Sequence, residues 1–181
     1  MARLPDPTGR LSGDGRAIYE RMLARRQSQC TGLYGPYTAL LHHPRLAEGI
    51  ERLGYYYKFE STLPRDVYQF VVLAFARRTG IEFEWLDHLD HARRAGLPEE
   101  VIDALAAGDG QLPEPYRSVR ECMDVVLRYQ SIPESLQAEV VRLVGVEGLL
   151  EIVTLCGFYG LIGMVSTSFD VPLPSAARGR A

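Results

Sequence analysis

The sequence predicts an all-α protein, and three observations support this prediction. Apolar residues recur at intervals of three and four along most of the chain, which is the spacing of a buried helix face. Prolines and glycines divide the chain into pieces of helix length. No segment alternates apolar and polar residues over the length of a strand. We therefore expect about eight helices and no sheet.

Three helices are expected in the first third of the chain. Residues 1–11 contain several prolines and glycines and predict an N-terminal arm. A helix over residues 12–29 follows, with a serine as its N-cap. A short helix over 37–43 must stop before Pro44, because the residue preceding a proline avoids the helical region. The next apolar pattern predicts a helix over 45–59.

The strongest helical pattern lies in the middle of the chain. A proline opens a helix over 64–79, where its missing N–H costs nothing, and Gly80 ends it. A second helix over 81–95 stops at Gly96. Two apolar helices joined by so short a connection predict a central antiparallel hairpin.

The last part of the chain predicts further helices and a tail. A helix begins at residue 98 with acidic residues in its first turn, where the helix dipole favours them. The glycine- and proline-rich segment 108–115 is expected to be a linker. Later helices are expected over 116–129, 135–144 and 148–169. Together the elements suit one domain over residues 12–171, followed by a C-terminal tail over 172–181.

Charge and composition exclude several classes of protein. The 181 residues include 20 basic and 23 acidic side chains, and 46% are hydrophobic. Proteins that bind nucleic acid usually have a basic surplus, so we expect no nucleic-acid partner. The start of the sequence has no apolar leader, so we expect no secretory signal. Three widely spaced cysteines give no disulfide framework, which fits a protein of the cytoplasm.

The apolar segment 149–165 is about as long as a membrane helix. It contains Glu151 and three glycines, Gly157, Gly160 and Gly163, which a lipid-facing helix tolerates poorly. We therefore expect a core or subunit-interface helix and no membrane partner. The small residues would allow a second helix to approach closely.

The ionisable residues that could carry chemistry gather between residues 82 and 91. Glu84, His88 and His91 are four and three residues apart, so they share one helix face. A carboxylate beside an imidazole fixes its tautomer and raises its basicity, as proton transfer near neutral pH requires. We expect no metal, because no third histidine follows the two histidines at a spacing typical of metal-binding motifs. The alternative is a solvated face with ordinary ion pairs, formed by Glu84, Asp87, Asp90 and His91.

Three segments, 63–73, 80–88 and 95–100, resemble the carboxymuconolactone decarboxylase family of the alkylhydroperoxidase D-like superfamily. The pair His43-Pro44 and the closing segment also fit, so the resemblance covers residues 12–174. It implies an alkylhydroperoxidase D-like helical bundle built around the antiparallel hairpin. It also implies a homo-oligomer (dimer, trimer or hexamer), a small-molecule substrate and no metal or organic cofactor.

The sequence departs from the peroxidase branch of that superfamily at the thiols. The glutamate of that branch is replaced by Gln69, and the two cysteines by Ile81 and Glu84. Its histidine is retained as His88. Reversible sulfur oxidation needs a thiolate, so a disulfide-based peroxidase is not expected.

The resemblance implies that the residues that remain perform acid–base chemistry. His88 would be the general acid/base, with Glu84 orienting it and Gln69 as a neutral hydrogen-bond partner. Tyr159 and His91 are candidate substrate contacts, although a tyrosine in an apolar helix more often packs in the core. The expected function is a cofactor-free lyase or isomerase acting on a small unsaturated or lactone carboxylic acid. The alternatives are an alkylhydroperoxidase-like antioxidant protein or a non-catalytic small-molecule-binding paralogue.

Overall fold

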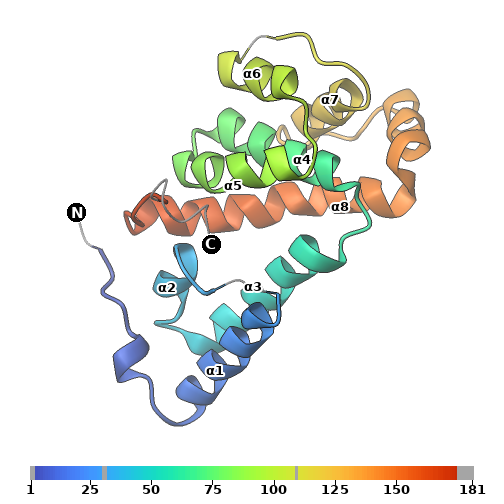
Figure 1. Cartoon of the computed structure of the whole chain (residues 1–181). Helices are drawn as coiled ribbons and strands as arrows, with labels where there is room; N and C mark the ends of the chain where they lie inside the picture. Colours follow the sequence, from blue (N-terminus) through green and yellow to red (C-terminus); the bar gives the residue numbers. More distant parts are fainter. Residues whose placement is uncertain (1–2, 30–31, 109, 175–181) are drawn as a thin grey trace. The chain divides into compact units, whose positions relative to one another are not determined.

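A computed structural model of the chain describes residues 3–29, 32–108 and 110–174, and all regular structure in these ranges is helical (Figure 1). The prediction of an all-α protein is confirmed. The α-helices are α1 (Gly13–Gln27), α2 (Pro36–Leu40), α3 (Pro44–Tyr55), α4 (Arg65–Thr79), α5 (Glu82–Arg94), α6 (Glu99–Ala107), α7 (Tyr116–Val126) and α8 (Glu134–Ser168). A 3₁₀ turn, η1 (Thr8–Arg10), precedes α1, and a π-helical turn, η2 (Tyr56–Glu60), continues α3. Most of the expected tail, residues 175–181, lies outside the described residues.

Glycine sets several of the boundaries that the sequence predicts. Gly80 and Gly108 follow α4 and α6 with φ of 71° and 88°. This left-handed conformation is strained for residues with a side chain, so a glycine there ends a helix. The two predicted C-terminal helices are the two parts of α8, which are separated at Gly145, where φ of 76° and ψ of 170° are not helical.

The contacts divide the described chain into two compact units. Unit 1 comprises residues 3–61 and 162–173, and unit 2 comprises residues 62–161 with residue 174. Helix α8 therefore contributes its longer part to unit 2 and its last residues to unit 1.

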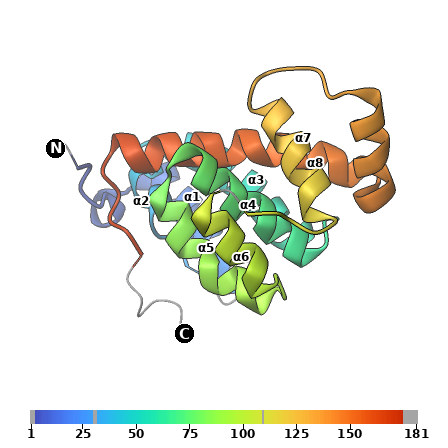
Figure 2. The same ribbon diagram turned by 90° about the horizontal axis from the view of Figure 1, so that it is seen from above.

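Helix α4 is the centre of unit 2. Its ten residues Val67–Ala76 are all buried, as expected for a helix that is covered all round. It contacts α5, α6 and α7, and Figures 1 and 2 show α4 and α5 side by side, which confirms the predicted hairpin. The carboxylate of Glu151 accepts hydrogen bonds from the backbone N–H of Thr62 (3.0 Å) and of Leu63 (3.3 Å), just before α4 begins. The negative charge at this end also interacts favourably with the positive end of the helix dipole.

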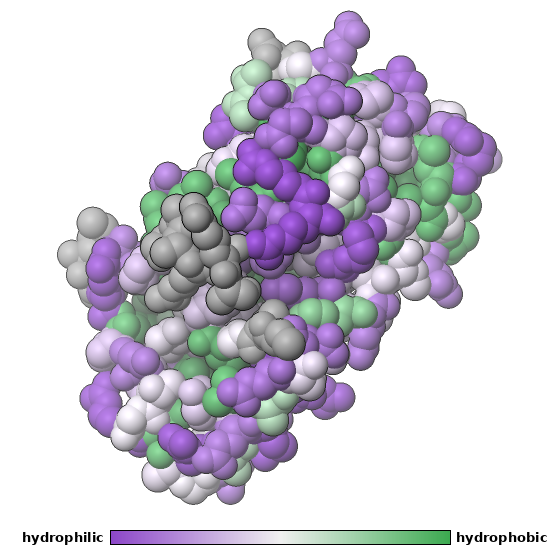
Figure 3. Space-filling model, in the orientation of Figure 1, coloured by the Kyte–Doolittle hydropathy of each residue, from purple (hydrophilic) through white to green (hydrophobic). Residues whose placement is uncertain are grey.

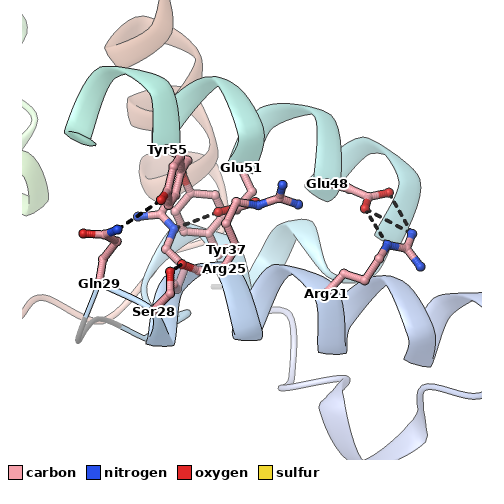
Figure 4. A network of polar contacts seen from close by, with 9 residues as sticks. Arg21, Arg25, Ser28, Gln29, Tyr37, Glu48, Glu51 and Tyr55 are labelled. Atoms are coloured by element: carbon pink, nitrogen blue, oxygen red, sulfur yellow. Dashed lines mark hydrogen bonds and ion pairs between the residues drawn. The ribbon is translucent and has the colours of Figure 1, made fainter. Parts of the chain in front are cut away.

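Unit 1 contains a buried ion-pair network between α1 and α3 (Figure 4). The carboxylate of Glu51 is fully buried, and its two oxygens accept from Nε of Arg26 (2.9 Å) and Nε of Arg25 (3.0 Å). Arg26 also donates to the hydroxyl of Tyr37 (3.0 Å). A buried carboxylate would be costly alone, and here both of its oxygens are paired with a guanidinium group.

Helix α8 is long and apolar enough, by length and composition, to cross a membrane, and 56% of its most apolar window is buried inside the protein. Core helices of soluble proteins pass the same test, so this is weak evidence for a membrane span. Figure 3 shows polar residues over most of the face that it draws, with an apolar patch over the stretch of α8 around its kink. Val146 and Leu150 in that stretch are about 60% exposed.

Candidate active site

His88 is the centre of a buried polar cluster in unit 2. Helix α5 contributes His88 and Glu84, helix α4 contributes Gln69, and helix α8 contributes Tyr159. These four side chains are between 3% and 6% exposed. The structure thus brings together three predicted catalytic residues and one of the two predicted substrate contacts.

The Nδ1 atom of His88 lies 2.8 Å from Oε1 of Gln69. An amide oxygen only accepts hydrogen bonds, so Nδ1 of His88 carries the proton. In the neutral imidazole the other ring nitrogen, Nε2, then carries a lone pair that can accept a hydrogen bond. Gln69 therefore sets the tautomer in which Nε2 is the base.

The Nε2 atom of His88 faces a hydroxyl and a carboxylate. It lies 3.1 Å from the hydroxyl of Tyr159 and 3.7 Å from Oε2 of Glu84. The Tyr159 hydroxyl lies 2.9 Å from that of Tyr68. When Nε2 accepts a hydrogen bond from the Tyr159 hydroxyl, the oxygen of Tyr159 accepts a hydrogen bond from the Tyr68 hydroxyl. The hydrogen bonds then run in one direction, from Tyr68 through Tyr159 and His88 to Gln69.

Local sequence explains part of this arrangement. Glu84 and His88 are one helical turn apart on α5, so the same face carries both. Gln69 lies on α4, and the short connection after Gly80 folds α5 back along it. Tyr159 comes from α8, 71 residues after His88, and only the packing of unit 2 brings it to the imidazole.

His91 lies next to the cluster, one turn beyond His88 on the same helix. The centroids of the two imidazole rings are 5.8 Å apart. His91 and Asp87 are half-buried and Asp90 is exposed, so part of this helix borders solvent as the alternative interpretation expected. Glu84 is buried, and it does not belong to a solvated face.

Two residues of this region were not predicted as site residues. Tyr68 is 1% exposed and joins the cluster through Tyr159. The guanidinium carbon of Arg65 lies 4.5 Å from the centroid of the Tyr68 ring. Tyr68 directly precedes Gln69 in the sequence, but its role depends on a partner from α8, and no spacing within α4 indicates that partner.

The two described cysteines are buried, and burial raises the pKa of both thiols. Burial raises the pKa of the Cys122 thiol to about 11. Burial, with a smaller effect of Cys122, raises the pKa of the Cys156 thiol to about 12. Both are therefore protonated near neutral pH, whereas thiol chemistry needs the thiolate. Cys30 lies outside the described residues.

Among the residues that the structure describes, no three histidine, cysteine or acidic side chains are grouped to hold a metal ion. Comparison with known proteins adds nothing to the geometry: no family model, no curated protein and no solved structure matches the chain.

Proposed function

We propose that the chain is a cofactor-free acid–base enzyme, a lyase or isomerase acting on a small unsaturated or lactone carboxylic acid. The observation that carries the proposal is the environment of His88. Its Nδ1 proton is held by a neutral amide at 2.8 Å, and its Nε2 lies 3.7 Å from the buried carboxylate of Glu84. The imidazole is oriented on one side, and a negative charge on the other side stabilises its protonated form.

The lyase reaction would need only one proton from this site. The bond between the substrate and its carboxylate breaks, CO₂ leaves, and the electron pair moves into the unsaturated carbonyl system to form an enolate. The protonated imidazole of His88 then gives the proton on Nε2 to a carbon of the enolate. Neutral His88 regains a proton from water, and the cycle closes. General acid catalysis of this kind contributes about two to four orders of magnitude in rate.

The isomerase reaction would use the same nitrogen twice. Neutral His88 takes a proton from one carbon of the substrate at Nε2, and the pair of electrons moves along the unsaturated system. His88 then returns the proton to a different carbon, which shifts the double bond. His91, half-buried beside His88, is the proposed substrate contact on the side toward solvent.

The remaining proposals depend on the resemblance to the carboxymuconolactone decarboxylase family. They are membership of that family, assembly into a homo-oligomer and a place in the cytoplasm. The exposed Val146 and Leu150 on α8 support the assembly, because a second copy could cover them. An alkylhydroperoxidase-like activity is disfavoured, because burial raises the pKa of both described thiols.

A non-catalytic protein that binds a small molecule is the second candidate. The observation in its favour is the burial of Gln69, Glu84, His88 and Tyr159, since a buried and hydrogen-bonded network also stabilises a fold. Turnover separates the two candidates. A binding protein would bind unsaturated acids saturably and leave them unchanged.

The experiment is an assay of the protein against a panel of unsaturated lactone acids, with CO₂ release and double-bond shift as readouts. His88→Gln should lower turnover about two to four orders of magnitude while circular dichroism stays unchanged. The matched control is His42→Gln, which removes an exposed imidazole in unit 1. Full activity of the His88 variant on a turned-over substrate would show that His88 is a structural histidine.

A further inference from the structure

A cavity of about 590 Å³ opens in unit 1, where α3 continues into the π-helical turn η2. Its lining combines two arginines, two tyrosines, a leucine and a glutamate: Arg25, Arg52, Leu53, Tyr55, Tyr56 and Glu60. All six belong to unit 1, whereas the candidate active site belongs to unit 2. Ligand sites in proteins commonly have volumes of roughly 300–1,000 Å³, so this cavity has room for a small organic molecule.

The charged side chains that line this cavity differ in whether they pair with another group of the protein. Arg25 is already used, because its Nε donates to the buried carboxylate of Glu51 at 3.0 Å. Arg52 and Glu60 form no ion pair and no hydrogen bond through their side chains within the described ranges of the chain. The cavity therefore offers one cation and one anion that the fold itself does not use.

The π-helical turn explains why these two charges line the same cavity. Glu60 comes eight positions after Arg52, and in a continuous α-helix the two residues would be rotated about 80° apart around the axis. A π-helical turn has more residues per turn, so each residue of η2 rotates less and Glu60 comes back toward the side of Arg52. Such turns are rare and are frequently found at functional sites.

The wall between the charges consists of a leucine and two tyrosines, and contacts hold Tyr55 in place. The ring of Tyr55 packs against that of Phe59, with centroids 4.8 Å apart. The Tyr55 hydroxyl accepts a hydrogen bond from Nε2 of Gln29 at 3.2 Å (Figure 4). Leu53 is 45% exposed and adds apolar surface. A flat apolar group could replace water against this wall.

We infer that this cavity binds a small zwitterion with a flat apolar body, of the aromatic amino-acid class. The guanidinium of Arg52 would bind the carboxylate of the ligand, and the carboxylate of Glu60 would bind its ammonium group. The ring of the ligand would pack on Tyr55 and Leu53. Eight helical residues advance about 12 Å, and the long side chains of arginine and glutamate can converge on a ligand shorter than that.

The test is calorimetric titration of the full chain with three probes. These are L-phenylalanine, 3-phenylpropionate, which lacks the ammonium group, and 2-phenylethylamine, which lacks the carboxylate. L-Phenylalanine should bind saturably, and each analogue should bind about tenfold or more weakly, because one charged hydrogen bond is lost. Equal affinity for all three, or no saturable binding of L-phenylalanine up to millimolar concentrations, would overturn the inference.

Two variants assign the charges. Arg52→Gln should weaken the binding of L-phenylalanine about tenfold and leave the binding of 2-phenylethylamine unchanged. Glu60→Gln should weaken the binding of L-phenylalanine likewise, but leave the binding of 3-phenylpropionate unchanged. Both side chains are exposed, so circular dichroism should match the wild type. The matched controls Arg45→Gln and Glu20→Gln remove the same charges from exposed positions elsewhere in unit 1. If the controls weaken binding as much as the cavity variants, the effect is one of net charge and the assigned contacts are wrong.

Discussion

The carboxamide oxygen of Gln69 accepts a hydrogen bond from Nδ1 of His88 across 2.8 Å, so a neutral side chain orients the imidazole of the cluster. A glutamate at this position would also accept from Nδ1, but it would add a negative charge that favours the protonated imidazole. The choice of an amide therefore leaves Glu84, near Nε2, as the acidic side chain of the cluster.

Gln69→Glu should shift the alkaline limb of the pH–rate profile to higher pH. The second carboxylate stabilises protonated His88, so the general acid persists at a pH where the wild type has lost it. The measurement is the rate of CO₂ release from the best substrate between pH 5 and 10. Glu84→Gln is the opposite control: it removes a carboxylate, and the same limb should move to lower pH. A profile that neither variant moves would show that His88 is not the titrating group.

The spacing of apolar residues and the positions of glycine and proline were enough to predict the helices, because both are local properties of the sequence. Gly80 and Gly108 end helices through their own backbone conformation, and no distant contact is needed. The pairing of Glu84 with His88 is also local, since the two residues are one turn apart. The contact between Tyr159 and His88 depends on how α8 packs, and sequence separation carries no information on it.

The buried charges of unit 1 were not predicted either. Arginines and glutamates in an amphipathic helix are usually exposed, so the pattern gives no reason to bury Arg26 or Glu51. They are buried because each compensates the charge of the other, at 2.9 Å, across two different helices. The π-helical turn after α3 likewise has no recognised signature in its sequence.

Tyr159→Phe should reduce turnover and stability together. The change removes the hydroxyl that contacts both His88 Nε2 and the Tyr68 hydroxyl in a buried environment. Loss of buried hydrogen bonds of this kind costs about 1–3 kcal/mol in the free energy of unfolding. Urea denaturation and the CO₂ assay measure the two effects. Tyr68→Phe is the control, because it leaves the contact between Tyr159 and His88 intact and should retain most of the activity.

The two buried cysteines should make the protein less stable above pH 9. Burial raises the pKa of Cys122 from 9.0 to about 11 and helps to raise that of Cys156 from 9.0 to about 12. Between these values the unfolded chain releases protons that the folded chain retains, so the free energy of unfolding falls as pH rises. Below pH 9 the contribution is fully present. One pKa unit corresponds to about 1.4 kcal/mol, so each thiol should lower the free energy of unfolding by about 2 kcal/mol at pH 10.5.

Urea denaturation at pH 8 and pH 10.5 measures this loss. The variant with Cys122→Ala and Cys156→Ala should lose less stability over that interval, although its stability at pH 8 will be lower because it has two small cavities. Tyr116 contributes to the remaining slope in both proteins, because burial and the hydrogen bond to Asp66 raise the pKa of its hydroxyl. An equal loss in the variant and the wild type would mean that the thiols do not titrate as their burial requires.

Glu51→Gln should be among the most destabilising single changes in unit 1. The carboxylate of Glu51 is fully buried and pairs with Arg25 and Arg26, and Arg26 itself is only 5% exposed. Glutamine keeps the shape but removes the charge, so a buried guanidinium is left without its counter-ion. Breaking a buried ion pair on one side costs about 3–5 kcal/mol, much more than the pair contributes relative to an apolar replacement.

Glu48→Gln is the matched control for that change, on the same helix and also paired with an arginine of α1. Glu48 accepts from Arg21 at 3.1 Å and 3.2 Å, but the side chain of Arg21 is 56% exposed (Figure 4). Water replaces the lost contact there, and the free energy of unfolding should fall by less than about 1 kcal/mol. Urea denaturation of both variants at pH 7 gives the comparison. Equal costs would mean that water reaches the carboxylate of Glu51, and that the pair with Arg26 is no stronger than one at the surface.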